Sequence, residues 1–415
     1  MARAGQVRSP SGDRLTDRVG IGVLTRSFPA ELVDEVVAGQ GRTEQRSRLL
    51  PARLVVYYLI ALALFASDAY EEVMRRLVAG LTWTARGRVV WRVPSSPAIS
   101  KARARLGPAV LAALFDRVAV PLAAVGTAGA FYRGWRLVAV DGSSLDAPDE
   151  AANTARFGKP SNDQGKGAFP RVRLVALAEC GTHALFGAAM DAITVGEQDL
   201  LRRLLGKLGT GMLVIADRNF LGYDLWQQCA ATGADLLWRA KSDTRLPVVA
   251  ELPDGSYLSY LVQPGTRGRG KRVTARVIEY TLQASESEHP HKAGEVYRLV
   301  TTILDPTAAP AEDLAEAYAQ RWEIESVFDE IKTHQQEARP VLRSRDPDGV
   351  EQEIWGILLL HHAIRDLIHT SARDAGIDPD RVSFVRALRA ARPLVSDQAG
   401  LSPLPATPRD PRGGR

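Results

Sequence analysis

Between residues 135 and 242 the sequence alternates short apolar segments with amphipathic ones, and this order restricts the possible fold more than any other feature. WRLVAVDGSSLDAP (Trp135 to Pro148) predicts an apolar strand that runs into a polar turn, and RVRLVALAECGTHALFGAAMDAI predicts a hairpin. A helix, the strand GMLVIADRNF, a second helix and the strand DLLWRAK follow. Strands interspersed with helices in this way predict a mixed α/β sheet that is covered by helices.

The flanking segments differ from this core in composition and periodicity. The first residues are polar and rich in Arg, Ser and Gly, and a helical pattern then runs to about residue 125. After the core, alternating segments separated by Pro and Gly predict a β-rich insertion. The predicted divisions are a flexible arm (1–25), an all-α N-terminal domain (26–125), the first part of the core (130–242), the insertion (243–297), the second part of the core (298–370), and a C-terminal helix and tail (371–415).

Composition excludes several classes of protein. The longest apolar run, Leu54 to Ala66, has 13 residues, whereas a membrane span needs about 20. We therefore expect a buried helix there and no membrane association. The two cysteines occur in unrelated settings, which argues against a disulfide framework and fits a reducing cytoplasm. A net charge of +5 and a pI of about 9.2 favour a polyanionic partner, most often nucleic acid.

Two aspartates stand at the ends of apolar strands, where catalytic groups of α/β sheets gather. Asp141 follows RLVAV and Asp217 follows MLVIA. Either residue alone could simply cap the turn that follows its strand. Together with Glu325 on a later helix, however, they predict a cluster of hard oxygen donors, which selects Mg²⁺ or Mn²⁺ over Zn²⁺. Two such ions about 4 Å apart would suit in-line phosphoryl transfer.

The segment YAQRWEIESVFDEIK predicts a helix with an unusual polar row. At about 100° per residue, Tyr318, Arg321, Glu325 and Lys332 fall within about 60° of one another, beside an apolar stripe that must face a core. An alternative is an ordinary solvated face on which Arg321 and Glu325 form an i,i+4 pair worth a few tenths of a kcal/mol.

These residues resemble a known family. Asp141 in VAVDGSSLDAP, Asp217 in VIADRNFLGYDLW and the ungapped Y-x2-R-x3-E-x6-K motif from Tyr318 to Lys332 are similar to the DDE transposases of bacterial insertion sequences. The last motif is the signature of the insertion-sequence-four family. The segment RSRLLPARLVVYYLIALALFASDAYEEVMRRL also resembles the N-terminal domain of that family, so the resemblance extends from about residue 20 to 370.

The resemblance implies a ribonuclease-H-like core with a β-rich insertion and a cut-and-paste reaction. Water would cleave one strand at an element end, the freed 3′-OH would form a hairpin with the opposite strand, and a reopened end would join target DNA. By position, Asp141, Asp217 and Glu325 would bind two Mg²⁺ ions, with Mn²⁺ as an alternative. Tyr318, Arg321 and Lys332 would hold the phosphates next to the scissile bond.

Further basic residues are candidates for DNA contacts, although each set also has a structural alternative. Arg218 could orient phosphate or cap a turn, and the Gly/Arg-rich loop could follow the backbone or stay solvated. A short basic helix predicts either a helix-turn-helix unit or part of a plain helical bundle. The loop and helix candidates are Arg267, Arg269, Lys271, Arg272, Lys101, Arg103 and Arg105.

The expected partners are double-stranded DNA, as terminal inverted repeats and as target, and a second copy of the chain in a synaptic homodimer. Such a protein would act in the cytoplasm at the nucleoid. Two alternatives remain open: a ribonuclease-H-like nuclease that cuts without joining, and a DNA-binding product of a decayed element. A strand-transfer assay with a pre-cleaved 3′-OH end separates the nuclease from the transposase.

Overall fold

The computed structural model describes residues 23–45, 50–79, 83–84, 87–88, 93–162, 165–265, 270–281, 296–336 and 340–392. Most of the predicted arm and all of the predicted tail after residue 392 therefore lie outside the described residues, as do Arg267 and Arg269. None of the helices in the described ranges combines the length and apolar character that crossing a bilayer requires.

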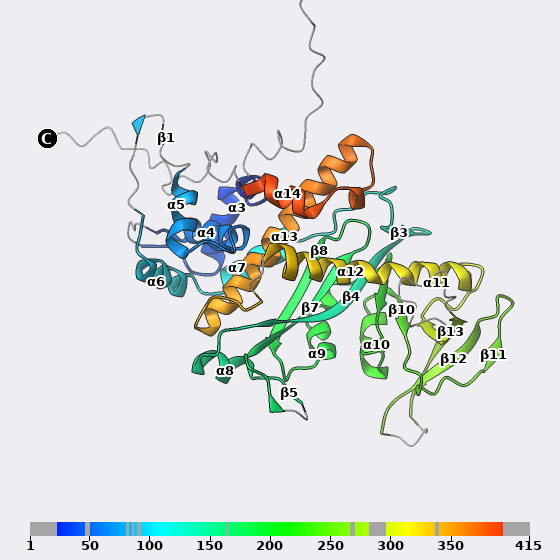
Figure 1. Ribbon diagram of the computed structural model, residues 1–415. Coiled ribbons are helices and arrows are strands. Elements are labelled where there is room, and N and C mark those ends of the chain that lie inside the picture. Colours follow the sequence, from blue (N-terminus) through cyan, green and yellow to red (C-terminus); the bar gives the residue numbers. More distant parts are fainter. Residues whose placement is uncertain are drawn as a thin grey trace, which may run out of the picture.

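The N-terminal region is helical, as its periodicity predicts (Figure 1). Its helices are α2 (Val23–Ser27), α3 (Ala30–Gly39), α4 (Ala52–Leu64), α5 (Tyr70–Ala79), α6 (Ser96–Leu106) and α7 (Ala109–Val118), with the short strands β1 (Trp83–Thr84) and β2 (Gly87–Arg88) between α5 and α6. The apolar run of 13 residues forms most of α4, which is buried along nearly its whole length. Pro51 precedes this helix, where its missing N–H leaves no hydrogen bond unmade.

Ten strands of the described chain form one sheet, in the order β11-β12-β13-β14-β10-β9-β4-β7-β8, with β3 paired to β4. They are β3 (Phe131–Tyr132), β4 (Trp135–Asp146), β7 (Arg171–Glu179), β8 (Leu185–Ala192), β9 (Met212–Ala216), β10 (Asp235–Arg239), β11 (Ala250–Glu251), β12 (Tyr257–Val262), β13 (Arg272–Thr281) and β14 (Val296–Thr301). The pair β5 (Ser161–Asn162) and β6 (Gly165–Lys166) lies apart from it.

The central strands confirm the expected mixed α/β core. Counted along the chain from β4, the strands β8-β7-β4-β9-β10 have the order 3-2-1-4-5, in which β4, β9 and β10 are parallel and β7 is antiparallel to both neighbours. This is the ribonuclease-H-like arrangement. A right-handed twist and short connections allow each parallel crossover to carry a helix: α9 (Glu197–Arg202) precedes β9, and α10 (Tyr223–Ala230) joins β9 to β10.

The two faces of the sheet are covered by different helices because strand residues alternate in direction. Leu137 and Ala139 of β4 belong to the hydrophobic cluster that includes α4 and α13 (Pro347–Ala375). Val138 and Val140 belong to the cluster that includes α9 and α10. The helical N-terminal region and the sheet therefore share one core, and α4 packs along α13 (Figure 1).

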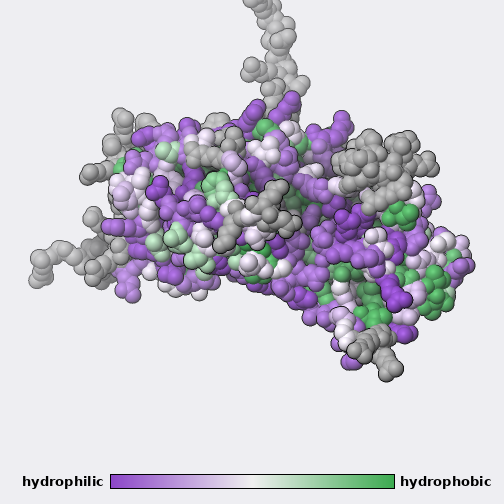
Figure 2. All heavy atoms as spheres, turned by 60° about the horizontal axis from the view of Figure 1, so that its bottom comes forward, coloured by the Kyte–Doolittle hydropathy of each residue, from purple (hydrophilic) through white to green (hydrophobic). Residues whose placement is uncertain are grey.

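The strands that were expected to form an insertion extend the same sheet. β14 pairs with β10 on one side and with β13 on the other, so the sheet continues without a break into β12 and β11. Figure 2 shows a largely hydrophilic face, with apolar side chains gathered towards this end of the molecule. Val248, Val249 and Val296 are exposed there.

The Y-R-E-K segment is helical throughout, but it is not the single regular α-helix that the sequence predicted. α11 (Ala311–Ala319) gives way to a 3₁₀ turn (η4, Gln320–Trp322), then to α12 (Glu323–Asp329) and a π-helical stretch (η5, Glu330–Gln335). Tighter and wider turns replace the uniform 100° step, so distant residues in the row are not aligned by periodicity alone. Shorter helices complete the fold: α8 (Ala151–Phe157), η2 (Leu205–Lys207), η6 (Pro379–Arg381) and α14 (Phe384–Ala391).

Candidate active site

Asp141 and Asp217 are brought together by the register of two parallel strands. Val140 of β4 is paired with Ala216 of β9, so the residues that follow them occupy the same level of the sheet. Asp141 continues β4, and Asp217 begins the turn after β9. Their side chains belong to the face on which Leu137 packs, because residues two apart on a strand share a face.

The environment of Asp141 is electrostatically unfavourable for its carboxylate. Burial raises the pKa of Asp141 to about 6, and the negative charges of Asp217 and Glu325 add to the rise. The backbone N–H of Gly142, which donates to Oδ1 at 2.7 Å, and the Arg321 guanidinium act in the opposite direction. Three carboxylates therefore interact at one place with too little positive charge to neutralise them.

Arg321 joins Asp141 to the helix that carries the third acid. Its Nη2 donates to Glu325 Oε1 at 2.9 Å, the i,i+4 pair that the sequence predicted, while Nη1 lies 3.5 Å from Asp141 Oδ2. Arg321 is 8 % exposed, whereas the Glu325 side chain is 45 % exposed. The guanidinium thus lies between the two acids, and Glu325 faces the open side of the site.

The acidic residues fit a divalent cation by their chemistry. Carboxylate oxygens are hard donors of the kind that Mg²⁺ and Mn²⁺ prefer, and a bound cation would act against the burial and the negative charges of Asp217 and Glu325 that raise the pKa of Asp141. The three acids are not a closed ligand cage, however. Among the described residues, the group whose ligand atoms all lie within 4.8 Å of one another is a different one, made by His183, Glu323 and Asp380.

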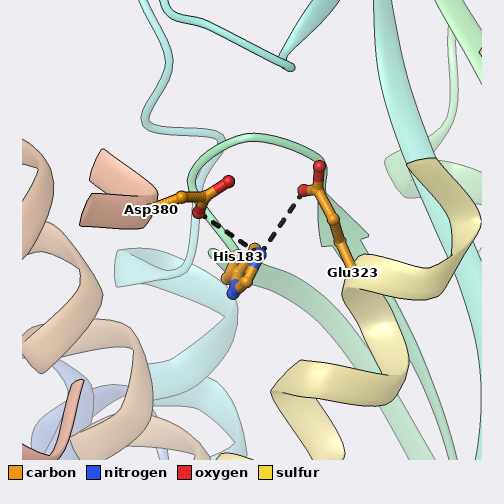
Figure 3. A group of neighbouring side chains, drawn as sticks. All are labelled: His183, Glu323 and Asp380. Atoms are coloured by element: carbon orange, nitrogen blue, oxygen red, sulfur yellow. Dashed lines mark ion pairs between the residues drawn. The ribbon is translucent and has the colours of Figure 1, made fainter. Parts of the chain in front are cut away.

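That second group links α12, which carries Glu323, to η6, which carries Asp380, through His183 in the turn between β7 and β8 (Figure 3). Arg365 Nη2 lies 2.5 Å from His183 Nδ1; because an arginine N–H can only donate, Nδ1 accepts and the neutral ring carries its proton on Nε2. Nε2 faces carboxylate oxygens of Glu323 and Asp380 at 3.5 Å each, so the imidazole links these two acids to Arg365. Burial raises the pKa of Glu323 to about 7.

Tyr318 and Lys332 occupy the two ends of the motif in different settings. Tyr318 is 4 % exposed, and its hydroxyl lies 3.4 Å from the carbonyl oxygen of Ala216, directly before Asp217. Lys332 is exposed at its end of the π-helical stretch. Partial burial of the Lys332 side chain and the positive charge of Arg171 lower the pKa of Lys332, while the charges of Asp146 and Asp141 act against that change.

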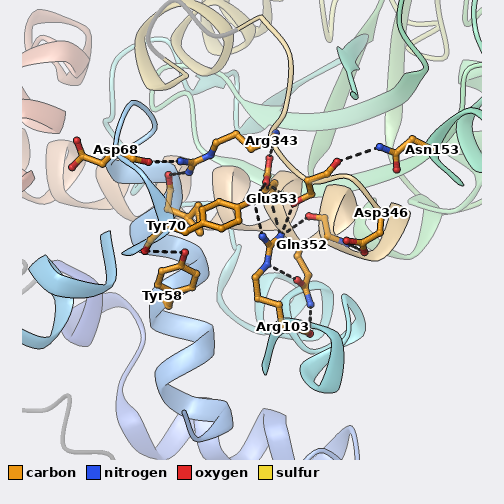
Figure 4. Close-up of polar contacts among 12 residues, drawn as sticks. Tyr58, Asp68, Tyr70, Arg103, Asn153, Arg343, Asp346, Gln352 and Glu353 are labelled. Atoms are coloured by element: carbon orange, nitrogen blue, oxygen red, sulfur yellow. Dashed lines mark hydrogen bonds and ion pairs between the residues drawn. The ribbon is translucent and has the colours of Figure 1, made fainter. Parts of the chain in front are cut away.

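The other predicted DNA contacts fall into two groups. Lys271 and Arg272 at the start of β13, Arg218 after Asp217, and Lys101 and Arg105 on α6 are exposed. Arg103 differs from the prediction, because it is 5 % exposed and its guanidinium is surrounded by protein (Figure 4). Lys101 and Arg105 of α6 are exposed, whereas the Arg103 guanidinium is hydrogen-bonded to residues at the start of α13, so Arg103 is not free to contact a phosphate.

Sequence reasoning missed one acid beside the site. Glu197 begins α9, and its side chain lies against Gly142, the residue after Asp141. Nothing in its local sequence distinguishes it from any acidic residue in the first turn of a helix, where the helix dipole favours negative charge. A glycine directly after Asp141, within a strand, is a weak signal that another group approaches the backbone closely.

Two protein families match the chain. Residues 18–116 match the family described as insertion element 4 transposase N-terminal, and residues 133–362 match the transposase DDE domain family. The transposase InsG for insertion sequence element IS4 of Escherichia coli (strain K12) is 28 % identical over 390 residues, covering 92 % of this chain and 84 % of that protein. A cryo-EM structure of the piggyBac transposase synaptic complex with hairpin DNA aligns with a TM-score of 0.45 at 11 % identity, covering 90 % and 79 % of the two chains.

Proposed function

The chain belongs to the insertion-sequence-four family of DDE transposases, and on this premise we propose that it excises its element through hairpin ends and joins the freed 3′-OH to target DNA. The observation that carries the proposal is the parallel register of β4 and β9, which sets Asp141 and Asp217 side by side. Glu325 is linked to the same place through Arg321.

Use of divalent metal follows from the DDE domain, and we propose Mg²⁺, as two ions, with Mn²⁺ as a substitute. Asp141, Asp217 and Glu325 would hold them. When bound, such ions stabilise the entering and leaving oxygens of the phosphodiester. Glu325 would have to release Arg321 to take part, because the guanidinium now occupies the space between Glu325 and Asp141.

The residues of the chain itself would position DNA. Arg321, released from Glu325, can pair with a phosphate in a bidentate manner, and Lys332 offers a point charge on the same side. Tyr318 would contribute by fixing the turn before Asp217 through its contact with Ala216, unless DNA binding exposes its hydroxyl. The exposed basic residues on α6 and at the start of β13 would follow the backbone of double-stranded DNA, both terminal repeats and target.

We further propose that two copies of the chain hold two element ends in a homodimer, and that the protein acts in the cytoplasm at the nucleoid. We also propose that the chain is divided as the sequence predicts, into an arm, a helical domain, a core interrupted by an insertion, and a tail. The helical region would add DNA contacts close to the active site, because α4 and α13 fix it against the catalytic sheet.

The test uses the full chain with DNA that carries the element end. Asp141→Asn, Asp217→Asn and Glu325→Gln should each abolish Mg²⁺-dependent cleavage while DNA binding is kept, because a lost negative charge does not weaken contacts to phosphate. Asp199→Asn, an exposed change on α9, is the matched control. Wild-type cleavage by any of the three variants would contradict the proposal.

A pre-cleaved 3′-OH end tests the joining step separately. Transfer of this end to target DNA is expected for a transposase, whereas cleavage without transfer would indicate the nuclease alternative. DNA binding without turnover in either Mg²⁺ or Mn²⁺ would indicate the product of a decayed element. A hairpin species on a denaturing gel distinguishes the proposed route from simple double-strand cleavage.

A further inference from the structure

Arg321 is held between the first and the third acid of the site. Its Nη2 donates to Glu325 Oε1 at 2.9 Å, and its Nη1 lies 3.5 Å from Asp141 Oδ2. The central carbon of the guanidinium lies 4.5 Å from the centroid of the Trp322 ring, which adds a cation–π contact. Because Arg321 is buried, these groups and not bulk water surround most of its charge. The side chain therefore acts as the counterion of both acids.

The guanidinium fills the space that a shared cation would need. Mg²⁺ binds carboxylate oxygens at about 2.0–2.1 Å, so an ion held by Asp141 and Glu325 together would lie between their oxygens. Nη1 and Nη2 of Arg321 lie in that space. The positive charge of the guanidinium would also repel a divalent ion there. Binding of the ion by both acids and these contacts of Arg321 are therefore mutually exclusive.

Arg321 has no substitute in this position. Within the described part of the chain it is the one basic residue that forms an ion pair with Asp141 or with Glu325. Without it, a divalent ion would gain the full attraction of both carboxylates and would displace no competing charge. Loss of Arg321 should thus strengthen metal binding, whereas loss of a residue that merely supports the site would weaken it.

The Arg321 side chain can leave this position without a change of fold. Arg321 lies in η4, one turn before Glu325 in α12, so their i,i+4 contact can be broken by side-chain rotation alone. The Glu325 side chain is 45 % exposed, so an anion can approach the pair from that side. Because a guanidinium forms bidentate pairs with phosphates as well as with carboxylates, a DNA phosphate is an alternative partner for Arg321.

We propose that Arg321 is a gate on the divalent-metal site. In the DNA-free protein its guanidinium takes the place of a cation between Asp141 and Glu325, and a DNA phosphate that pairs with Arg321 frees both acids for metal. This inference rests on the proposed metal-dependent function. Because binding effects are reciprocal, DNA should strengthen metal binding and metal should strengthen DNA binding by the same factor. The chain would then bind its cation mainly where DNA is already bound.

Metal binding without DNA is the first test, because it does not depend on turnover. In Arg321→Met, the dissociation constant for Mn²⁺, measured by titration of the full chain, should fall about 5- to 150-fold. Arg105→Met removes an exposed arginine from α6 and should leave the dissociation constant unchanged. A dissociation constant in Arg321→Met that equals or exceeds the wild-type value would overturn the gate.

The coupling between DNA and metal is the second test. A pre-cleaved element-end duplex serves as the DNA, since it cannot be cut again at that end during the titration. At saturation, this duplex should lower the Mn²⁺ dissociation constant of the wild type by about 5- to 150-fold, and that of Arg321→Met by much less. An equal effect in both proteins would mean that Arg321 does not transmit the coupling, which also overturns the gate.

The outcomes separate this inference from the proposed function. Loss of Mn²⁺ affinity in Asp141→Asn, together with wild-type affinity in Arg321→Met, would refute the gate and leave the three-acid site intact. Unchanged Mn²⁺ binding and cleavage in Asp141→Asn would instead refute the proposed function. If Arg321→Met unfolds, as a thermal melt would show, the wild type decides the question: equal Mn²⁺ affinity with and without the duplex refutes the gate.

Discussion

Arg103 fixes the helical N-terminal region to the long helix α13, and its replacement by methionine should loosen that contact. The guanidinium is enclosed between α6 and the start of α13 (Figure 4). It makes hydrogen bonds of 2.8 to 3.2 Å to Ser344 Oγ, the Gly349 carbonyl oxygen, Tyr70 Oη and Gln352 Oε1, and lies 3.9 Å from Glu353.

The size of the effect follows from what the substitution leaves behind. Glu353 is 7 % exposed and would stay buried without the nearby positive charge of Arg103. Breaking a buried ion pair by removing one partner typically costs about 3–5 kcal/mol, because the other charge loses its counterion. Glu353 keeps hydrogen bonds from Ser344 Oγ and the Arg343 backbone N–H, so we expect a cost at the lower end of this range. Methionine fills most of the volume, so we attribute the cost to lost hydrogen bonds and charge, and only little of it to a cavity.

Amide hydrogen exchange measures the loss of stability separately for each segment of the chain. A local measurement is needed because a chain of this size is not expected to unfold in a single two-state step. A loss of about 3 kcal/mol or more corresponds to exchange at least about 100-fold faster in the backbone of α6 and the first turns of α13. Arg105→Met, on the exposed side of α6, should leave exchange nearly unchanged. Glu353→Gln in the Arg103→Met background removes the stranded charge and should recover part of the protection.

Two results would refute this reasoning. Exchange in Arg103→Met that matches the wild type would show that the buried contacts contribute no net stability. Weakened DNA binding with unchanged exchange would show that Arg103 reaches DNA after all, as the sequence of α6 had suggested.

Three further predictions concern packing and pH. Gly356→Ala should lower the unfolding free energy by about 1–3 kcal/mol, because its Cβ would lie 2.7 Å from the Leu59 carbonyl oxygen where α13 crosses α4; thermal melts measure this. Without metal, Asp141→Asn should stabilise the protein above pH 6 by about 1–3 kcal/mol. The reason is that the raised pKa of Asp141 makes the native state lose stability as the pH rises from about 4 to about 6. Glu330→Gln should cost about 3–5 kcal/mol at neutral pH. Although burial alone would raise it, a hydrogen bond from buried His361 and the charge of Arg365 hold the pKa of Glu330 well below its usual value. The stability that Glu330 contributes is therefore present above pH 4.5 and is lost as the pH falls further.

Each of these three predictions has a control or a result that would contradict it. Gly39→Ala places a Cβ in open space and should be neutral or slightly stabilising. For Asp141, saturating Mg²⁺ should reverse the order, since a bound cation stabilises the ionised wild type and not the variant. For Glu330, a wild-type melting curve that does not change below pH 4.5 would contradict the assigned role.

Local sequence was sufficient for the elements that carry the site. Runs of apolar residues predicted strands ending at Asp141 and Asp217. β9 does end directly before Asp217, but β4 continues through Asp141 to Asp146, where the sequence predicted a polar turn, because β7 pairs with it along that length. The four-residue spacing of Arg321 and Glu325 predicted their contact, which the helix keeps at 2.9 Å. Strand positions and i,i+4 contacts depend on residues that are close together in the chain, so the local sequence is enough to predict them.

Tertiary structure alone decided which of these groups meet and which are buried. The pairing of β4 with β9 depends on contacts between residues more than 70 positions apart, and no local pattern specifies that register. The same holds for Arg103, which resembles the exposed Lys101 and Arg105 on α6 in sequence but is buried where α13 packs over it. It also holds for Glu197 of α9, whose contact with Gly142 of β4 no local pattern indicates. Burial and charge pairing arise from distant segments of the chain, so they become visible only when the chain is folded.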